Sequence, residues 1–479
     1  MRRAHLVSEV RRAEQALMAT LPPGTLMQRA ASGLAAAAAD WLGTVYGSRV
    51  LLLVGAGDNG GDALYAGSRL ARRGARVEVL TVAGSAHEGG MAALRRAGGR
   101  AVDRPARYDL VVDGIVGIGG RPGLSGSVAE IVAGLEAPVL AVDVPSGVGV
   151  DTGVLAGAHV AAAVTVTFGT HKVCHFVQPA AGAAGTVHLV DIGLAPYLGG
   201  PAVEVLQAVD VGALLPRPTT DTHKYLRGVL GVRAGSAEYP GAGLLVVEAA
   251  VAAGLAGMVR YVGASADLVR SRRPEVVVGE GRVQARVVGP GLGRTAAKVV
   301  PGLLAQTLPT VVDADGLGQL PARLAAPTVL TPHAGELARM LGTDRSSVEE
   351  AMLESACSAA ARWNAVVVLK GSHSVVAAPD GSVRVNTAGV DWLATAGAGD
   401  VLSGVIGSLL AAGLSPYDAA SAGCWLHGTA ATLASAGGPL SAGAVSGALP
   451  AAVRAALAAG GGPDRYGNDG PSAGGTSSG

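Results

Sequence analysis

The chain has 479 residues, which is too long for one ordinary hydrophobic core, so we expect two or three domains. Apolar residues make up 49% and charged residues 15%, which favours packed interiors, and the net charge of +1 excludes the basic surface of a nucleic-acid-binding protein. The three cysteines, Cys174, Cys357 and Cys424, have neither metal-ligand spacing nor the pattern of a disulfide framework. A reducing, cytoplasmic location is therefore expected.

Hydropathy raises the question of a membrane segment, because the mean hydropathy is +0.40. The best candidate, residues 401–417, is interrupted by glycines, ends at Ser415-Pro416 and is flanked by Asp400 and Asp418. It is therefore expected to be a buried helix rather than a membrane span. The first 18 residues carry charges throughout, unlike the apolar core of a signal peptide. We expect a soluble protein with no membrane partner.

Short runs of Val, Leu and Ile recur through the first half, and each closes on a turn that contains Gly or Asp. Segments of helical length, rich in Ala, Leu and Arg, lie between most of them. Continuous apolar strands that alternate with helices indicate a parallel sheet covered on both faces. The predicted strands of this half are residues 50–54, 77–82, 110–112 and 139–142.

The second half repeats this pattern, with predicted strands at residues 229–232, 311–312 and 366–369. A passage rich in Pro and Gly, residues 194–206, separates the halves, so we place the domain boundary near residue 210. The predicted fold class is α/β, with two three-layer domains at residues 1–210 and 211–461. Residues 462–479 contain almost nothing to bury and are expected to be disordered.

The strand at residues 50–54 runs directly into a glycine-rich turn, GAGDNGGD. Asn59 and Asp62 are expected at the start of the next helix, where free backbone N–H groups favour anions. Taken alone, the turn is as compatible with a structural role as with ligand binding. The turn also departs from the G-x-G-x-x-G fingerprint of dinucleotide folds. Gly55, Gly57 and Gly60 keep the glycine spacing, but the helix that follows needs Asp62 at its start.

Two later strands also end on a carboxylate, Asp113 before GIVGIGGRPG and Asp143 before VPSG. In open α/β sheets this edge is where ligands bind. A single Asp at a strand end is more often a helix cap, but three such ends beside glycine turns favour a binding site. Asn59, Asp113 and Ser146 offer hard oxygen ligands that suit a monovalent or divalent cation.

The segments GDNGGD, VDGIVGIGGRPG and VDVPSGVGVDTG resemble the three signature loops of the YjeF N-terminal family, the NAD(P)H-hydrate epimerases, whose fold is Rossmann-like. The resemblance implies that the first domain interconverts the R and S forms of the hydrated nicotinamide ring, with a potassium ion held by Asn59, Asp113 and Ser146. It implies Asp143 as the acid/base group, because a carboxylate can take and return the proton of the migrating hydroxyl. The residues implied to touch the substrate are Asp58, Asn59, Gly60, Gly61, Asp62, Gly117, Ile118, Gly119, Gly120, Arg121, Pro122, Gly123 and Asp143.

The first loop departs from the family pattern at two positions, Asp58 in place of Asn and Ala63 in place of Gly. An extra negative charge would weaken binding of a phosphate-bearing substrate, and the Cβ atom of Ala63 would crowd the start of the helix. Lys172, in TFGTHK, falls where the family usually has a lysine, and a solvated surface charge is the equal alternative.

The strongest motif of the second half is ATAGAGDVL, residues 394–402, in which a glycine-rich turn opens a long apolar helix. Backbone N–H groups of residues 396–399 would form an anion hole there. Phosphoryl transfer needs such a hole and a base that orients the acceptor hydroxyl, so Asp400 is the candidate base. The G-x-G-D arrangement resembles that of ribokinase-like kinases, and a helix-capping Asp is the alternative.

Further polar side chains follow other strands of this half. Lys370 follows residues 366–369 and could face a nucleotide phosphate, and Asp313 and Asp315 follow residues 311–312. His333 and Glu336 stand just before a predicted helix, where His333 is either a cap or a site residue. No Walker A sequence is present, so glycine turns must hold the phosphates.

The phrases THKY-x-RG, YPGA, VGPGLG, VDADGL, TPHAGE, LKG and AGAGDVL occur in this order and resemble the ADP/ATP-dependent NAD(P)H-hydrate dehydratases of the YjeF C-terminal family, which are ribokinase-like. The residues implied to contact the hydrate are Ala242, Gly291, His333 and Asp400. Those implied to contact the adenine nucleotide are Lys370, Gly371, Ser372, His373, Ser374 and Gly399. The departures are small: Ser374 stands where the family mostly has Thr, and Ala398 where it mostly has Ser or Thr.

The resemblance implies that Asp400 lets the hydroxyl of the S hydrate attack the terminal phosphate of ADP or ATP, so that phosphate then leaves in place of hydroxide. The expected cofactors are magnesium on the nucleotide and potassium in the first domain. The expected assembly is a homo-oligomer. Two alternatives stay open. The second domain could be a small-molecule kinase, and the first could be a non-catalytic interaction module such as those of RNA-decay scaffolds.

Overall fold

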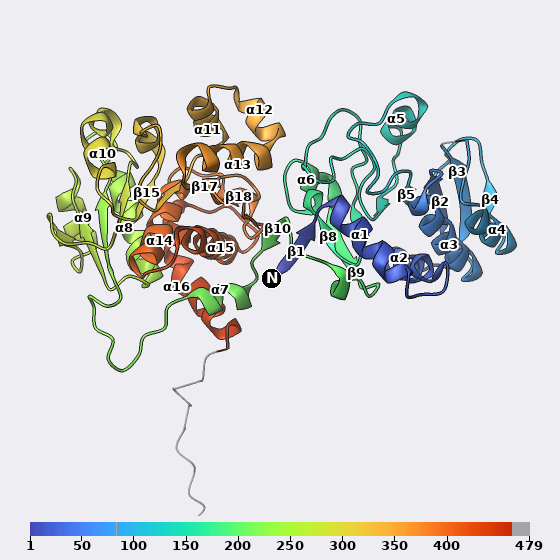
Figure 1. The fold of residues 1–479 in the computed structure, drawn as a ribbon, viewed down its shortest axis with the longest axis horizontal. Helices are drawn as coiled ribbons and strands as arrows, with labels where there is room; N and C mark the ends of the chain where they lie inside the picture. The colour runs from blue at the N-terminus through green and yellow to red at the C-terminus, as the bar shows by residue number, and fades with distance from the viewer. Residues whose placement is uncertain (83, 462–479) are drawn as a thin grey trace, which may run out of the picture.

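The structure, a computed structural model, describes residues 1–82 and 84–461 as two α/β domains that lie side by side (Figure 1). The predicted disordered tail, residues 462–479, lies outside the described residues. The fold class and the strands predicted from apolar runs are confirmed, within one or two residues at each end. The structure adds strands that join the two domains, which no run in the sequence predicted.

The first domain is built on a seven-stranded sheet in which every neighbouring pair is parallel. In sheet order its strands are β4 (Arg100–Ala101), β3 (Arg76–Thr81), β2 (Arg49–Val54), β5 (Leu110–Gly114), β6 (Val139–Val142), β7 (Val164–Phe168) and β9 (Thr186–Val190). The carboxyl ends of β2, β5 and β6 therefore lie next to one another, which brings the three glycine-rich loops to one edge.

Helices cover both faces of this sheet. Successive residues of a strand point to opposite faces, so each strand contributes side chains to two separate cores. Leu52 and Val54 of β2 belong to one core and Leu51 and Leu53 to the other. The helices of the domain are α1 (Val7–Met18), α2 (Thr25–Leu42), α3 (Asp58–Arg72), α4 (Glu88–Arg96), α5 (Gly126–Ala133) and α6 (Ala180–Ala184), with short 3-10 turns at Val173–His175 and Ala195–Tyr197. Because α3 begins at Asp58, Asp62 lies in its second turn, later than predicted.

The second domain is built on a mixed twelve-stranded sheet. In sheet order its strands are β13 (Val277–Val278), β12 (Met258–Tyr261), β11 (Val229–Arg233), β14 (Ala285–Val288), β15 (Thr310–Val312), β16 (Thr328–Leu330), β17 (Val366–Leu369), β18 (Ser374–Ala377), β19 (Val383–Asn386), β10 (Val203–Val205), β1 (Arg2–His5) and β8 (His171–Lys172). The pairs β17–β18, β18–β19 and β1–β10 are antiparallel, and the other pairs are parallel.

Two helical layers sandwich this sheet. Val311 and Val329 pack into the core beneath α8, α14, α15 and α16, whereas Val312 and Leu330 pack into the core beneath α10, α11 and α13. The helices are α7 (Ala208–Leu214), α8 (Pro240–Ala253), α9 (Ala266–Arg272), α10 (Ala296–Leu304), α11 (Ala334–Leu341), α12 (Arg345–Glu350), α13 (Met352–Trp363), α14 (Ala398–Ala411), α15 (Pro416–Ser435) and α16 (Ala442–Ala459), with 3-10 turns at Gly293–Thr295, Ala314–Gln319 and Asp391–Leu393.

The apolar stretch after Asp400 forms α14, which is almost wholly buried, as predicted. Among the described residues one helix, α16, is long and apolar enough by length and composition to cross a membrane. It packs against α15, α7 and α8 of the second domain. One side of α16 is therefore packed within the helical layer of the second domain.

Strands from the first half extend the second sheet. β1 pairs with β8 on one side and with β10 on the other, and β10 pairs with β19. Figure 1 shows β1 and β10 between the two domains. The predicted boundary near residue 210 falls inside α7, whose Val211 packs into the core of the second domain.

Candidate active sites

The three glycine-rich loops of the first domain surround a cavity of about 850 Å³. Close packing of backbone shapes its floor: a Cβ atom at Gly60 would lie 2.3 Å from the carbonyl oxygen of Gly55, so only glycine fits there. The predicted substrate residues that line the cavity are Asp58, Asn59, Asp62, Gly117, Ile118, Gly119 and Asp143. Gly60 and Gly61 are buried and do not line it. The prediction is wrong for Gly120, Arg121, Pro122 and Gly123, which lie outside the lining, with Arg121 and Pro122 exposed.

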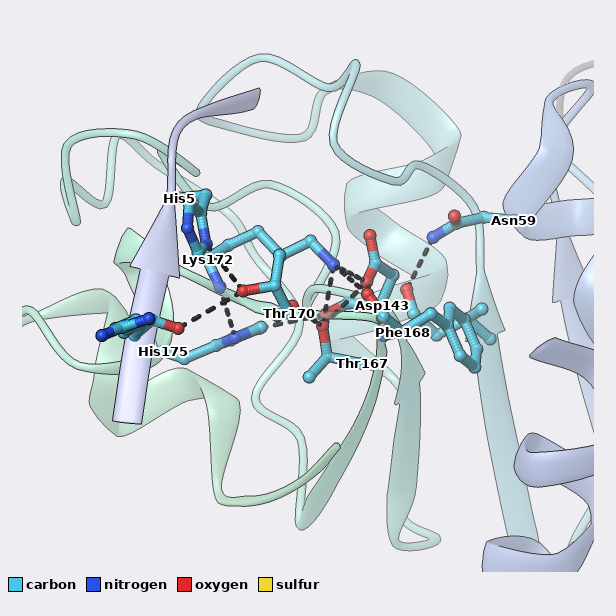
Figure 2. Close-up of polar contacts among 10 residues, drawn as sticks. His5, Asn59, Asp143, Thr167, Phe168, Thr170, Lys172 and His175 are labelled. Atoms are coloured by element: carbon cyan, nitrogen blue, oxygen red, sulfur yellow. Dashed lines mark hydrogen bonds and ion pairs between the residues drawn. The ribbon is translucent and has the colours of Figure 1, made fainter. Parts of the chain in front are cut away.

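Asp143 is fixed at the cavity wall by a dense set of donors (Figure 2). Its Oδ1 atom accepts hydrogen bonds from Lys172 Nζ, from Thr167 Oγ1 at 2.8 Å and from the Phe168 N–H at 3.3 Å. Within the described part of the chain, the Oδ2 atom accepts none, so it is free for a ligand. The backbone is left-handed at Asp143 (φ 66°), a conformation that costs a non-glycine residue about 1–3 kcal/mol and is common at functional sites.

Lys172 is not a solvated charge, because its side chain is 1% exposed and pairs with Asp143. His175 supports the pair from behind: its Nδ1 atom accepts from the Lys172 backbone N–H at 3.1 Å, and its Nε2 atom donates to the Asp143 carbonyl at 3.0 Å. Burial lowers the pKa of His175 to about 3, so the ring is neutral and its tautomer is fixed. Thr167 and His175 had no signal in the sequence beyond their place in the segment that contains Lys172.

Of the three predicted cation ligands, Asn59 lines the cavity, whereas Asp113 and Ser146 lie outside the lining and bond to each other. Asp113 is fully buried and accepts hydrogen bonds from Ser146 Oγ at 2.6 Å and from the Ser146 backbone N–H at 2.8 Å. Asn59 Nδ2 donates to the Val142 carbonyl at 2.6 Å, while its Oδ1 atom faces Gly117, where a Cβ atom would lie 2.3 Å away. Burial raises the pKa of Asp113 to about 6, and no cationic side chain pairs with it among the described residues. A buried carboxylate that no cationic side chain neutralises, with the Ser146 hydroxyl beside it, fits a bound cation.

The two departures in the first loop have different surroundings. Asp58 is exposed at the cavity, where its charge adds to those of its neighbours. Ala63 is fully buried, and its Cβ atom lies 2.8 Å from where a Cβ atom of Gly114 would be. The helix start tolerates Ala63 because residue 114 has no side chain. Asp62 is buried, and its Oδ1 atom has no hydrogen-bond partner among the described residues. Burial raises its pKa well above the usual range, and the charges of Asp143, Asp58 and Glu14 raise it further.

In the second domain Asp400 lies in the first turn of α14, after Gly397 in a left-handed conformation (φ 85°). Burial, the negative charge of Asp313 and, more weakly, those of Asp315 and Glu336 raise the pKa of Asp400 to about 7, although Lys370 acts to lower it. A carboxylate with this pKa can both accept and release a proton near neutrality.

Lys370 joins the other predicted residues of this site. Its ammonium lies 2.9 Å from Asp313 Oδ1 and 3.8 Å from Glu336 Oε2, and 3.2 Å from where a Cβ atom of Gly399 would be. Burial acts to lower the pKa of Lys370, but Asp313 and Glu336 outweigh it, so the net shift is upward. Asp313 Oδ2 also accepts from Ser403 Oγ at 2.8 Å, which ties the cluster to α14.

The remaining predicted residues lie on neighbouring elements. His333 is the N-cap of α11, with Nδ1 accepting from the Gly335 N–H at 3.0 Å and a half-exposed ring, so it fulfils the capping role at the edge of the site. Gly291 and Ala242 touch, because a Cβ atom at 291 would lie 2.6 Å from Ala242 Cβ.

The loop between β17 and β18 carries Lys370, Gly371, Ser372 and His373, and Ser374 begins β18. Ser374 Oγ lies 3.4 Å from the Gly371 N–H and closes this loop. The side chain of His373 turns to the first domain, where Nδ1 lies 2.7 Å from the Phe176 carbonyl.

Two family models match the chain. The model for the YjeF-related protein N-terminus matches residues 23–174, and the model for NAD(P)H-hydrate dehydratase matches residues 230–443. A crystal structure of ADP/ATP-dependent NAD(P)H-hydrate dehydratase from Bacillus subtilis, co-crystallized with ATP/Mg²⁺, superposes with a TM-score of 0.51 and 30% identity. It covers 53% of this chain and 99% of that one.

Relatives that contain both halves extend over most of the chain. The bifunctional NAD(P)H-hydrate repair enzyme Nnr of Mycobacterium leprae is 47% identical over 445 residues, which cover 88% of this chain and 91% of that protein. The enzymes of the same name from Mycobacterium tuberculosis and Moorella thermoacetica are 46% and 34% identical, and the matches cover 91% and 81% of their lengths. The chain therefore belongs to the family of bifunctional NAD(P)H-hydrate repair enzymes.

Proposed function

We propose that the first domain epimerises hydrated NADH and NADPH at the Asp143 cavity, and that the second domain dehydrates the S epimer at Asp400 with ADP as phosphoryl donor. The observation that carries this assignment is that each domain holds its own buried carboxylate–lysine cluster, Asp143 with Lys172 and Asp313 with Lys370 beside Asp400. Hydration produces both epimers, so an epimerase linked to an S-specific dehydratase repairs the whole pool.

In the second domain the difficulty is that hydroxide leaves poorly. Asp400 takes the proton of the substrate hydroxyl, whose oxygen attacks the terminal phosphorus of ADP, and AMP departs. The lone pair of the ring nitrogen then expels phosphate, and loss of the adjacent ring proton restores the dihydronicotinamide. Backbone N–H groups at the start of α14 and the Lys370 ammonium would stabilise the charge of the transferred group. Magnesium, when bound, would neutralise the nucleotide phosphates.

In the first domain, potassium is proposed at Asn59, Asp113 and Ser146, where it would neutralise the buried Asp113 and hold the loop of Asn59 for the substrate. Replacement of potassium by lithium, which is smaller, is expected to lower the epimerisation rate without changing dehydration of the pure S epimer. An unchanged epimerisation rate in potassium-free lithium buffer would exclude this site.

A mixture of the two epimers tests the bifunctional assignment. With ADP, Mg²⁺ and K⁺, the full chain is expected to restore all of the reduced cofactor, measured by its absorbance. Asp143→Asn is expected to restore the S share at the same rate and the rest only at the spontaneous rate of epimerisation. Equal, complete conversion by Asp143→Asn would refute the role of Asp143.

The proposed location is the cytoplasm, which is supported by the free thiols of Cys174, Cys357 and Cys424. We also propose a homo-oligomer. Light scattering of the purified chain tests the second point, since a monomer mass would exclude it.

A further inference from the structure

Helix α1 forms one wall of the epimerase cavity and carries a carboxyl that the proposed chemistry has not used. Val10, Ala13 and Leu17 bury one side of this helix, and Arg11, Glu14 and Met18 line the cavity. Hydrogen bonds fix the helix at both sides: the Val7 N–H donates to Asp151 Oδ1 at 2.9 Å, and Arg12 donates to the Tyr197 carbonyl at 2.8 Å. Glu14 is thus held at the cavity by a rigid element.

Glu14 is half-buried, yet it makes no hydrogen bond or ion pair with any other described residue. Asp143 follows β6 and so belongs to a different element of the lining; its Oδ1 atom accepts from Lys172, and its Oδ2 atom accepts no hydrogen bond from the described residues. Burial raises the pKa of Glu14; Lys172 lowers it, and Asp143 and Asp58 raise it. Besides Glu14, the charged or titratable groups around the cavity are Arg11, Asp58, Asp62, Tyr65, His87, Asp143 and, behind Asp143, Lys172. Four carboxyls line the cavity: Asp58 and Asp62 belong to α3, Asp143 is paired with a lysine, and Glu14 is unpaired on a separate helix. A lysine-paired carboxyl and an unpaired one on separate elements are the arrangement of a base and an acid.

Inversion of a carbon that bears a hydroxyl needs two such groups. The hydroxyls of the R and S epimers project from opposite faces of the ring, so one face must lose oxygen while the other gains it. One carboxyl on one face cannot serve both events without leaving its position. An acid and a base on two walls of the cavity can serve both.

We propose that Glu14 is a second catalytic residue of the epimerase and acts on the face opposite to Asp143. Glu14 donates its proton to the departing hydroxyl, the C–O bond breaks with its electron pair on oxygen, and the ring nitrogen lone pair forms a C=N bond. A water molecule adds to the same carbon from the other face, the nitrogen regains its lone pair, and Asp143 takes the released proton. The reverse reaction exchanges the two roles.

This inference rests on the proposed epimerase function, and the Glu14→Gln variant of the full chain tests it. Pure S hydrate is incubated without nucleotide, the epimers are separated by chromatography, and the spontaneous rate is subtracted. Glu14→Gln is expected to lower the epimerisation rate by roughly 10²-fold or more, the usual size of one acid/base contribution. Glu14→Asp, which keeps a carboxyl, should recover part of that loss.

Two controls separate catalysis from folding. Gln15→Ala changes an exposed side chain of the same helix that does not line the cavity, and it should keep the parent rate. Dehydration of S hydrate with ADP, measured on the same samples, should be unchanged in every variant. A Glu14→Gln rate within threefold of the parent would overturn the inference alone, whereas a parent chain that leaves the epimer ratio at its spontaneous drift would overturn the proposed epimerase as well.

The pH profile distinguishes a catalytic Glu14 from one that only supports the helix. Both directions of the parent reaction need a carboxyl pair that carries one proton, so its rate should fall as pH rises enough to remove that proton. The residual activity of Glu14→Gln should not show this fall. A variant that is slow but keeps the fall at high pH would show a structural role and overturn the assignment.

Discussion

At the scale of single residues, the two proposed catalytic carboxylates differ in how the protein holds them. Asp143 is anchored through Oδ1 to a buried lysine, which suits a group that must stay in place while its other oxygen reacts. Asp400 makes no such direct pair with any described residue, and Lys370, whose charge acts on it, is engaged by Asp313. The environment of Asp400 therefore sets its protonation, and this environment can be changed one charge at a time.

The first prediction concerns the pH dependence of dehydration. Asp400 acts as a base, so kcat/KM should rise with pH through the raised pKa of about 7. Asp315 is one of the charges that raise this pKa, and Asp315→Asn should therefore move the midpoint to lower pH. Asn can still accept the hydrogen bond that Asp315 Oδ2 receives from the Gly293 N–H. Asp380→Asn, on an exposed turn, is the matched control, and equal midpoints for the two variants would contradict the account.

At the scale of elements, the strands and the site edge could be predicted because their determinants are local. Apolar runs of three to five residues predicted β2, β5 and β6, and a carboxylate at a strand end predicted the cavity wall. The way in which neighbouring elements fit together depends on residues that are far apart in the sequence. Gly228, for example, faces the end of α14, where a Cβ atom would lie 1.7 Å from the Ala411 carbonyl oxygen.

The second prediction uses this contact. Gly228→Ala and Gly413→Ala both place a side chain at positive φ (83° and 99°), a strain of about 1–2 kcal/mol in each. Only in Gly228→Ala would the added Cβ atom also collide with backbone atoms, those of Ala411. This collision should lower the free energy of unfolding of the domain by a further 1–3 kcal/mol or so. Urea unfolding followed by tryptophan fluorescence measures this, because Trp363, Trp392 and Trp425 lie in the second domain. Equal urea midpoints for the two variants would contradict the prediction and show that α14 moves to make room for the added Cβ atom.

At the scale of the whole molecule, the domains share a sheet that the sequence did not reveal. The strands β1, β8 and β10 are two to four residues long and have no apolar run of their own. Their pairing depends on partners more than 150 residues away, such as Val203 of β10 with Ala4 of β1. For the same reason the contact of His373 with Phe176, which connects the β17–β18 loop to the segment that ends behind Asp143, had no signal in the sequence.

The third prediction follows from this shared sheet. A truncated chain that starts at Gly199 keeps β10 and α7, which cover β19 and pack Val211 into the core. A chain that starts at Pro216 lacks both and leaves β19 as an open edge, a site for aggregation. We expect the shorter chain to melt at lower temperature and to aggregate sooner. Identical melting of the two chains would mean that β10 and α7 add nothing to the second domain.

The central claim is that Asp400 turns a poorly leaving hydroxyl into a readily leaving phosphate. The most direct measurement follows the reduced nicotinamide absorbance when the full chain acts on pure S hydrate with ADP and Mg²⁺, for the parent and for Asp400→Asn. Asn keeps the size of the side chain but cannot take the proton, so the account predicts that the variant restores cofactor at least about 10²-fold more slowly. Restoration at the parent rate by Asp400→Asn would contradict it.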